Sequence, residues 1–103
     1  MALKPADLHI LLALSKSPRH GYGLMKDVET ESAGEVRLEL GSLYRLLARL
    51  TDEGLIQSMD GDERRRLYSL TPIGRRALQS EAQRLADLMK LMRSRKLLKE
   101  AQS

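Results

Sequence analysis

The chain has 103 residues, the size of one domain, and no cysteine, which excludes disulfides, thiolate metal sites and cysteine nucleophiles. Apolar residues make up 42% of it and aromatic residues only 3%, with no Phe and no Trp, so the core must consist of aliphatic side chains and Met. The net charge of +4 permits nucleic-acid binding without requiring it. We expect a cytoplasmic protein, because the first fifteen residues lack a cleavage site and are too short to span a membrane.

The first predicted helix covers residues 6–15. Leu8, Leu11 and Leu12 form one face of it, and other apolar residues fill much of the rest. A helix that is apolar nearly all round is usually buried on more than one side, so we expect a partner subunit on the second side. Residues 17–21 contain Pro and Gly and interrupt this helix.

A second helix is expected over residues 22–31 and a short strand over residues 36–38. The third helix is the clearest, because Leu43, Leu46, Leu47 and Leu50 follow the i, i+3, i+4, i+7 spacing of a single core stripe. Gly54 stands where a glycine ends a helix in the left-handed conformation.

A hairpin follows the third helix, with strands at residues 55–59 and 64–70 and an Asp-Gly turn at residues 60–63. Thr71 and Pro72 then predict a helix start, with Thr as the N-cap residue and Pro in the first turn. This last helix is expected to run almost to residue 103, roughly 45 Å. Its apolar residues repeat at coiled-coil spacing: Leu78, Ala82, Leu85, Met89 and Met92, with a second stripe at Leu88, Leu91 and Leu98.

This order of elements predicts a mainly α fold with a small β-hairpin: a winged helix-turn-helix over residues 1–76, followed by a long C-terminal dimerisation helix over residues 77–103. The third helix is suited to the major groove of DNA. The hairpin, or wing, carries Arg64, Arg65 and Arg66 directly after its turn. Consecutive strand residues point to opposite faces, so at least one of these arginines reaches outward.

Three stretches of the sequence, residues 20–24, 41–56 and 68–74, resemble the PadR family of bacterial transcriptional regulators, in its short subfamily with a single C-terminal helix. The resemblance covers about residues 8–78. It implies a sequence-specific homodimeric repressor on an inverted-repeat operator in double-stranded DNA, released by a small-molecule inducer or a stress signal. Glu39, Leu40 and Arg45 stand where the family usually has Ser, Pro and Pro. The family's drug-binding members use aromatic residues between subunits, and this chain has neither Phe nor Trp.

Two sets of residues are predicted to carry the function. The DNA-binding set is Ser42, Tyr44, Arg45, Arg49, Arg64, Arg65 and Arg66; the dimer-interface set is Leu8, Leu11, Leu12, Leu78, Leu85, Leu88, Met89 and Met92. The simpler alternatives are a solvated helix face for the helical arginines, and charge balance across the acidic turn for those of the hairpin. Tyr44 could equally be a half-buried support.

Other functions find little support in the sequence. His9 and His20 have no companion ligands, so no metal site is expected, and no cofactor is predicted. No phosphate-binding loop or clustered nucleophile indicates an enzyme. The basic tail at residues 93–99 is typical of a solvated helix face. The rival function is a winged helix that serves as a protein-interaction module without a DNA target, and the near balance of charge up to Arg76 keeps that alternative open.

Overall fold

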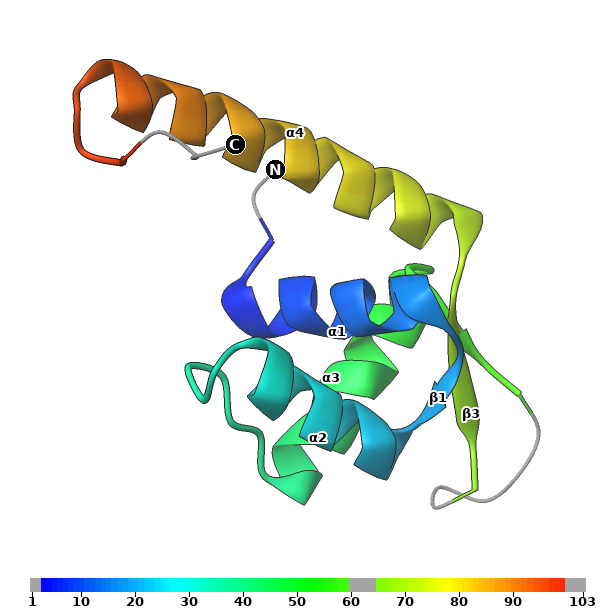
Figure 1. The fold of residues 1–103 in the computed structure, drawn as a ribbon. Coiled ribbons are helices and arrows are strands. Elements are labelled where there is room, and N and C mark those ends of the chain that lie inside the picture. The colour runs from blue at the N-terminus through cyan, green and yellow to red at the C-terminus, as the bar shows by residue number, and fades with distance from the viewer. Residues whose placement is uncertain (1–2, 60–64, 100–103) are drawn as a thin grey trace.

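The computed structural model describes residues 3–59 and 65–99. Its elements are, in chain order, α1 (Pro5–Lys16), β1 (Arg19–His20), α2 (Gly21–Glu31), α3 (Leu40–Asp52), β2 (Ile56–Ser58), β3 (Leu67–Leu70) and α4 (Pro72–Ser94). Figure 1 shows α1, α2 and α3 packed into one body with the strands along one side and α4 crossing above α1. The predicted fold class, a mainly helical winged helix-turn-helix followed by a long helix, is confirmed.

The core lies where the first three helices meet. The leucine stripe predicted for α3 is buried, and Leu43, Leu47 and Leu50 are fully inaccessible to solvent. The stripe packs against the buried side chains of the other two helices, which are Ile10, Leu11, Ala13 and Leu14 on α1 and Leu24 and Val28 on α2. Because the stripe occupies one side of α3, the opposite side of this helix is left for solvent or a partner.

The sheet has three antiparallel strands in the order β1-β3-β2. The hairpin was predicted, and β2 pairs with β3 with Ile56 opposite Leu70 and Ser58 opposite Tyr68. Strand β1 was missed, because its two residues fall in the segment that was expected only to interrupt the first helix. The strand expected at residues 36–38 was wrong: this segment connects α2 to α3 outside the sheet, and the Ser32 hydroxyl accepts a hydrogen bond from the Val36 amide. The predicted turn at residues 60–63 lies outside the described residues.

Helix α4 begins as predicted. Thr71 is its N-cap residue, and its hydroxyl accepts a 3.0 Å hydrogen bond from the Gly74 amide. Gly74 passes so close to the segment between α3 and β2 that a β-carbon there would lie 2.0 Å from the Leu55 carbonyl oxygen. The expectation that the helix continues almost to residue 103 was wrong, because α4 ends at Ser94 and Lys96 has a φ of 59°. The 23 residues of α4 span about 34 Å rather than roughly 45 Å.

Candidate nucleic-acid interface

The outer side of α3 is the first part of the candidate interface. Ser42 and Arg45 lie in its first turns, opposite the buried leucines, and Arg45 is exposed. The Arg45 guanidinium donates a 3.3 Å hydrogen bond to the Ser42 hydroxyl, an exposed contact that a ligand can replace. In helix-turn-helix proteins the second helix of the motif, which corresponds to α3 here, faces the bases of the major groove with its first turns.

Arg49, one turn further along α3, has a different environment. Its Nη2 donates a 2.7 Å hydrogen bond to Oδ1 of Asp7 on α1, and its Nη1 lies 3.1 Å from Oε2 of Glu53. The hydrogen bond with Asp7 is the main cause that raises the pKa of Arg49 above its usual value. The Asp7 side chain is only 10% exposed, so this ion pair ties the last turns of α3 to the first turn of α1. The structure therefore gives Arg49 a structural partner, and its predicted role in DNA binding stays a prediction.

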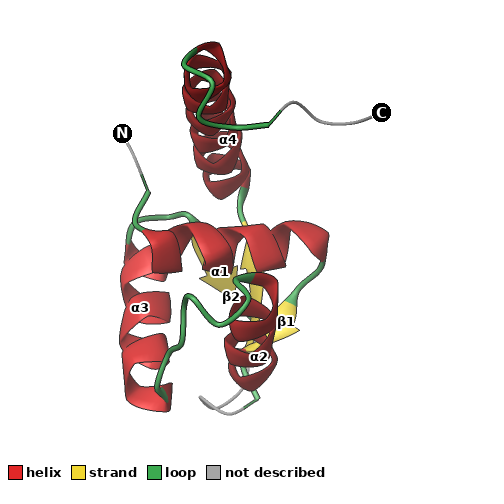
Figure 2. Cartoon of the chain, turned by 60° about the vertical axis from the view of Figure 1, so that its left-hand side comes forward, coloured by secondary structure: helices red, strands yellow, loops and turns green. Residues whose placement is uncertain are grey.

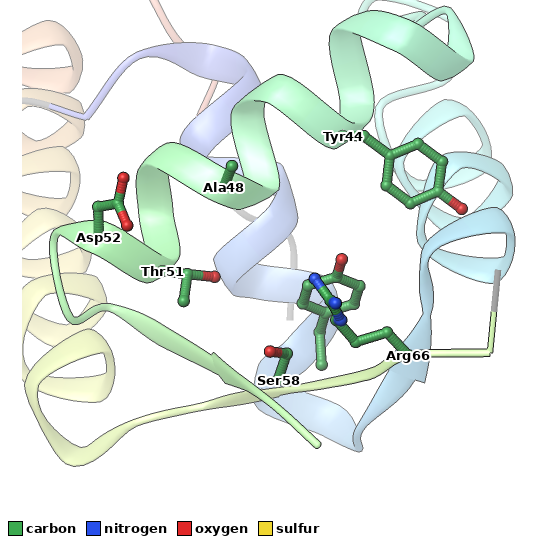
Figure 3. Close-up of a pocket in the computed structure, with 7 residues that line it drawn as sticks. Tyr44, Ala48, Thr51, Asp52, Ser58 and Arg66 are labelled. Atoms are coloured by element: carbon green, nitrogen blue, oxygen red, sulfur yellow. The ribbon is translucent and has the colours of Figure 1, made fainter. Parts of the chain in front are cut away.

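The position of Tyr44 is compatible with both a supporting role and a binding role. Its ring lies against the start of α2, where a β-carbon at Gly21 would lie 3.0 Å from Cε1 of the tyrosine. The same side chain borders a groove of about 210 Å³ between α3 and the hairpin. In Figure 3 the groove runs from Tyr44 and Thr51 on α3 to Ser58 and Arg66 on the hairpin side.

The wing contributes the second cationic part of the interface. Arg65 is exposed, whereas Arg66 is half-buried and extends its guanidinium from the start of β3 toward α3 (Figure 3). Arg64 lies outside the described residues. The groove also contains the carboxylate of Asp52, and Glu39 caps α3 without a side-chain hydrogen bond. The cations of the first turns of α3 and of the wing are thus interspersed with acids, which disfavours indiscriminate attraction to polyanions.

Apolar side chains predicted to form the dimer interface lie partly exposed on α1 and on the second half of α4. Leu12, Leu88 and Met89 are 40–44% exposed, and Leu8, Leu85 and Met92 are half-buried. Two predicted interface residues do not belong with them. Leu11 has no exposed surface because α1 turns it into the core, so its assignment to a dimer interface was wrong, and Leu78 is only 9% exposed in the same core.

Sequence reasoning missed the two acids that hold the helices together, Asp7 and Glu81, which are 7% and 2% exposed. Asp7 stands between Ala6 and Leu8, and Glu81 lies three positions after Leu78 and four before Leu85; an acid at these positions was the available signal. Among residues 3–59 and 65–99, no cluster of His, Asp or Glu is arranged to hold a metal ion. Within the same part of the chain, none of the helices has the length and apolar character needed to cross a membrane.

Comparison with known proteins agrees with this geometry. The family described as the transcriptional regulator PadR-like family matches residues 10–80. An uncharacterised 37.1 kDa protein in transposon Tn4556 of Streptomyces fradiae is 39% identical over 88 residues, which are 85% of this chain and 25% of that protein. The chain therefore spans about a quarter of the length of this curated relative.

Two solved structures resemble most of this chain in their fold. A PadR family transcription regulator from Clostridium difficile R20291 is 28% identical, with a TM-score of 0.74 over 88% of this chain and 97% of that one. PadR of Bacillus subtilis, solved in complex with operator DNA, is 26% identical, with a TM-score of 0.63 over 75% of this chain and 46% of that one. The order of the helices, the wing and the sequence matches all lead to one assignment: this chain belongs to the PadR-like family of transcriptional regulators.

Proposed function

We propose that the chain is a sequence-specific, homodimeric transcriptional repressor that binds an inverted repeat in double-stranded DNA in the cytoplasm. The observation that carries this proposal is the solvent-facing side of the first turns of α3, which lies beside a groove bordered by Arg66 of the wing. The structure of the Bacillus subtilis relative with operator DNA supports the choice of ligand.

The contacts divide by the chemistry that each side chain offers. Arg45, with Ser42 beside it, reaches the edges of the bases, because an exposed guanidinium can donate two hydrogen bonds to one guanine. Arg65 and Arg66 of the wing neutralise phosphates, together with Arg64 of the same run. Tyr44, at the rim of the groove between α3 and the hairpin, donates a hydrogen bond from its hydroxyl to the phosphate backbone of the DNA.

The dimer forms through the second half of α4 and the outer face of α1. Leu12 on α1 and Leu88 on α4 are exposed members of these two surfaces, each 40–44% accessible in the single chain. The other members of the interface are Leu8, Leu85, Met89 and Met92. Residues 1–76 then form the DNA-binding unit and residues 77–103 the dimerisation unit. A twofold axis relates the α3 helices of the two protomers, so the DNA target is an inverted repeat.

Two measurements test the proposal. Light scattering at micromolar concentration is expected to give twice the mass of the 11.6 kDa chain. Selection from a pool of genomic fragments is expected to enrich a motif whose two halves are inverted copies of each other. A monomer, or a pool that shows no enriched motif after several rounds, would contradict the proposal. The second of these results would favour the protein-interaction module instead.

A further inference from the structure

Helix α4 packs on the rest of the chain through one line of residues, and that line contains a charge. Gly74, Leu78 and Glu81 are its buried residues, spaced by four and three positions. The same line continues to Leu85 and Leu88 on the part of α4 that the chain leaves uncovered. Glu81 therefore occupies a core position at the point where α4 leaves the rest of the chain. An apolar residue could fill this position, yet the chain has an acid there.

The carboxylate of Glu81 makes two kinds of contact. Its Oε2 accepts a 2.9 Å hydrogen bond from the backbone N–H of Leu3, just before α1. Arg84 donates to both carboxylate oxygens, with Nε 2.6 Å from Oε1 and Nη2 3.0 Å from Oε2. These contacts lower the pKa of Glu81, and the hydrogen bonds from Arg84 have the largest effect, so the group is ionised at neutral pH. The contact with Leu3 joins α4 to the segment that leads into α1, and α1 in turn holds α3 through Asp7.

Contacts of polar and backbone groups fix the direction of α4 at two points, one on either side of the buried Leu78. The first is its base, where the Thr71 hydroxyl donates hydrogen bonds to the Gly54 and Leu55 carbonyls and a side chain at Gly74 would overlap the Leu55 carbonyl. The second is Glu81. Beyond it, residues 82–94 project from the body for about 20 Å (Figures 1 and 2). A change of about 10° in the direction of α4 at Glu81 would move the C-terminal end of the helix by roughly 3–4 Å, close to the rise of one base pair.

We propose that Glu81 is a positioning residue that fixes the angle between α4 and the winged helix, and thereby the spacing of the two DNA half-sites that the dimer accepts. This inference rests on the proposed function, because it requires that α4 forms the dimer. A polar group at a core position selects one arrangement of packed helices, since any other leaves it without partners, whereas apolar contacts tolerate sliding. Glu81 contacts no DNA and acts through the geometry of α4.

The first experiment measures affinity for duplexes that carry the selected half-sites at different separations. One added base pair turns a half-site by roughly 35° and moves it by about 3.4 Å. We expect the unmutated chain to prefer one spacing by about tenfold or more over its neighbours. Glu81→Leu, which keeps the core position filled, should reduce this preference at least about threefold and leave binding to random DNA unchanged. Asp87→Leu is the matched control, because it removes an exposed acid of the same helix whose bond is to Gln83.

The second experiment tests the angle without DNA. The chain has no cysteine, so Glu31→Cys and Lys90→Cys introduce the only two sites for spin labels, one on α2 and one on α4. Dilution with unlabelled protein leaves only distances within one chain. A single narrow distance distribution is expected for the unmutated protein, and a broadened or displaced one after Glu81→Leu.

The two experiments separate the failure of this inference from the failure of the proposed function. If Glu81→Leu keeps both the spacing preference and the narrow distance distribution, Glu81 does not position α4 and the inference is overturned. If the unmutated chain binds all duplexes alike, the proposed function fails, and the distance distribution alone still decides whether Glu81 holds the angle.

Discussion

Replacing Arg49 with glutamine separates a structural role of this side chain from a role in DNA binding. Its ion pair with Asp7 joins a side chain that is 43% exposed to one that is only 10% exposed. Loss of the guanidinium leaves the Asp7 carboxylate without its charged partner, while water still reaches the arginine side of the contact. We therefore expect Arg49→Gln to lower the free energy of unfolding by about 1–3 kcal/mol. Each kcal/mol lowers the melting temperature of a domain of this size by about 4–8 °C.

Urea denaturation of Arg49→Gln, Asp7→Asn and the double variant forms a cycle that isolates the pair. We expect the double variant to lose less stability than the sum of the two single changes, because both break the same contact. In the DNA titration, a purely structural role of Arg49 requires that Arg49→Gln keep the slope of log K against log salt. A slope reduced by about 0.9, with additive stabilities in the cycle, would show that Arg49 binds a phosphate and would refute its structural role.

Three further predictions follow from the site. Arg45→Ala should lose about 1–3 kcal/mol on the selected duplex and much less on random DNA, whereas joint replacement of Arg65 and Arg66 by alanine should weaken both and flatten the salt slope; titrations of both DNAs at several salt concentrations distinguish the two roles. Leu85→Glu should dissociate the dimer and weaken operator binding together, as seen by light scattering and anisotropy, and a variant that stays dimeric with unchanged affinity would remove Leu85 from the interface. The pKa of Glu81 is lowered by folding, chiefly through Arg84, so its contribution to stability is present above its usual value of 4.5 and is lost as the pH falls through the lower folded value; Glu81→Gln should remove this part of the acid destabilisation, and an unchanged stability profile would contradict it.

The local features of the fold were predictable because they depend on residues close together in the chain. The stripe from Leu43 to Leu50 fixes the buried side of α3, and the Thr71-Pro72 pair marks the start of α4. Strand β1 carried no such signal, since two residues cannot show a period and their pairing depends on Tyr68 and Leu67.

The parts that the sequence did not reveal depend on contacts between distant residues. The ion pair of Arg49 was not predicted, because its partner Asp7 is 42 positions away in the chain. On α4 the predicted stripe included Ala82 and Met89, yet the line of contact with the body runs through Gly74, Leu78 and Glu81. Spacing alone does not choose between neighbouring faces of a helix, because the choice is made by what packs against it.

Selective binding to DNA is the central claim, and a competition titration measures it most directly. A labelled duplex with the selected inverted repeat is bound at about 0.15 M salt and displaced by the unlabelled repeat or by a scrambled duplex of the same length and composition. We predict that the repeat competes about a thousandfold better or more than the scrambled duplex, within the range of sequence-specific regulators. Equal competition by the two duplexes would contradict the account.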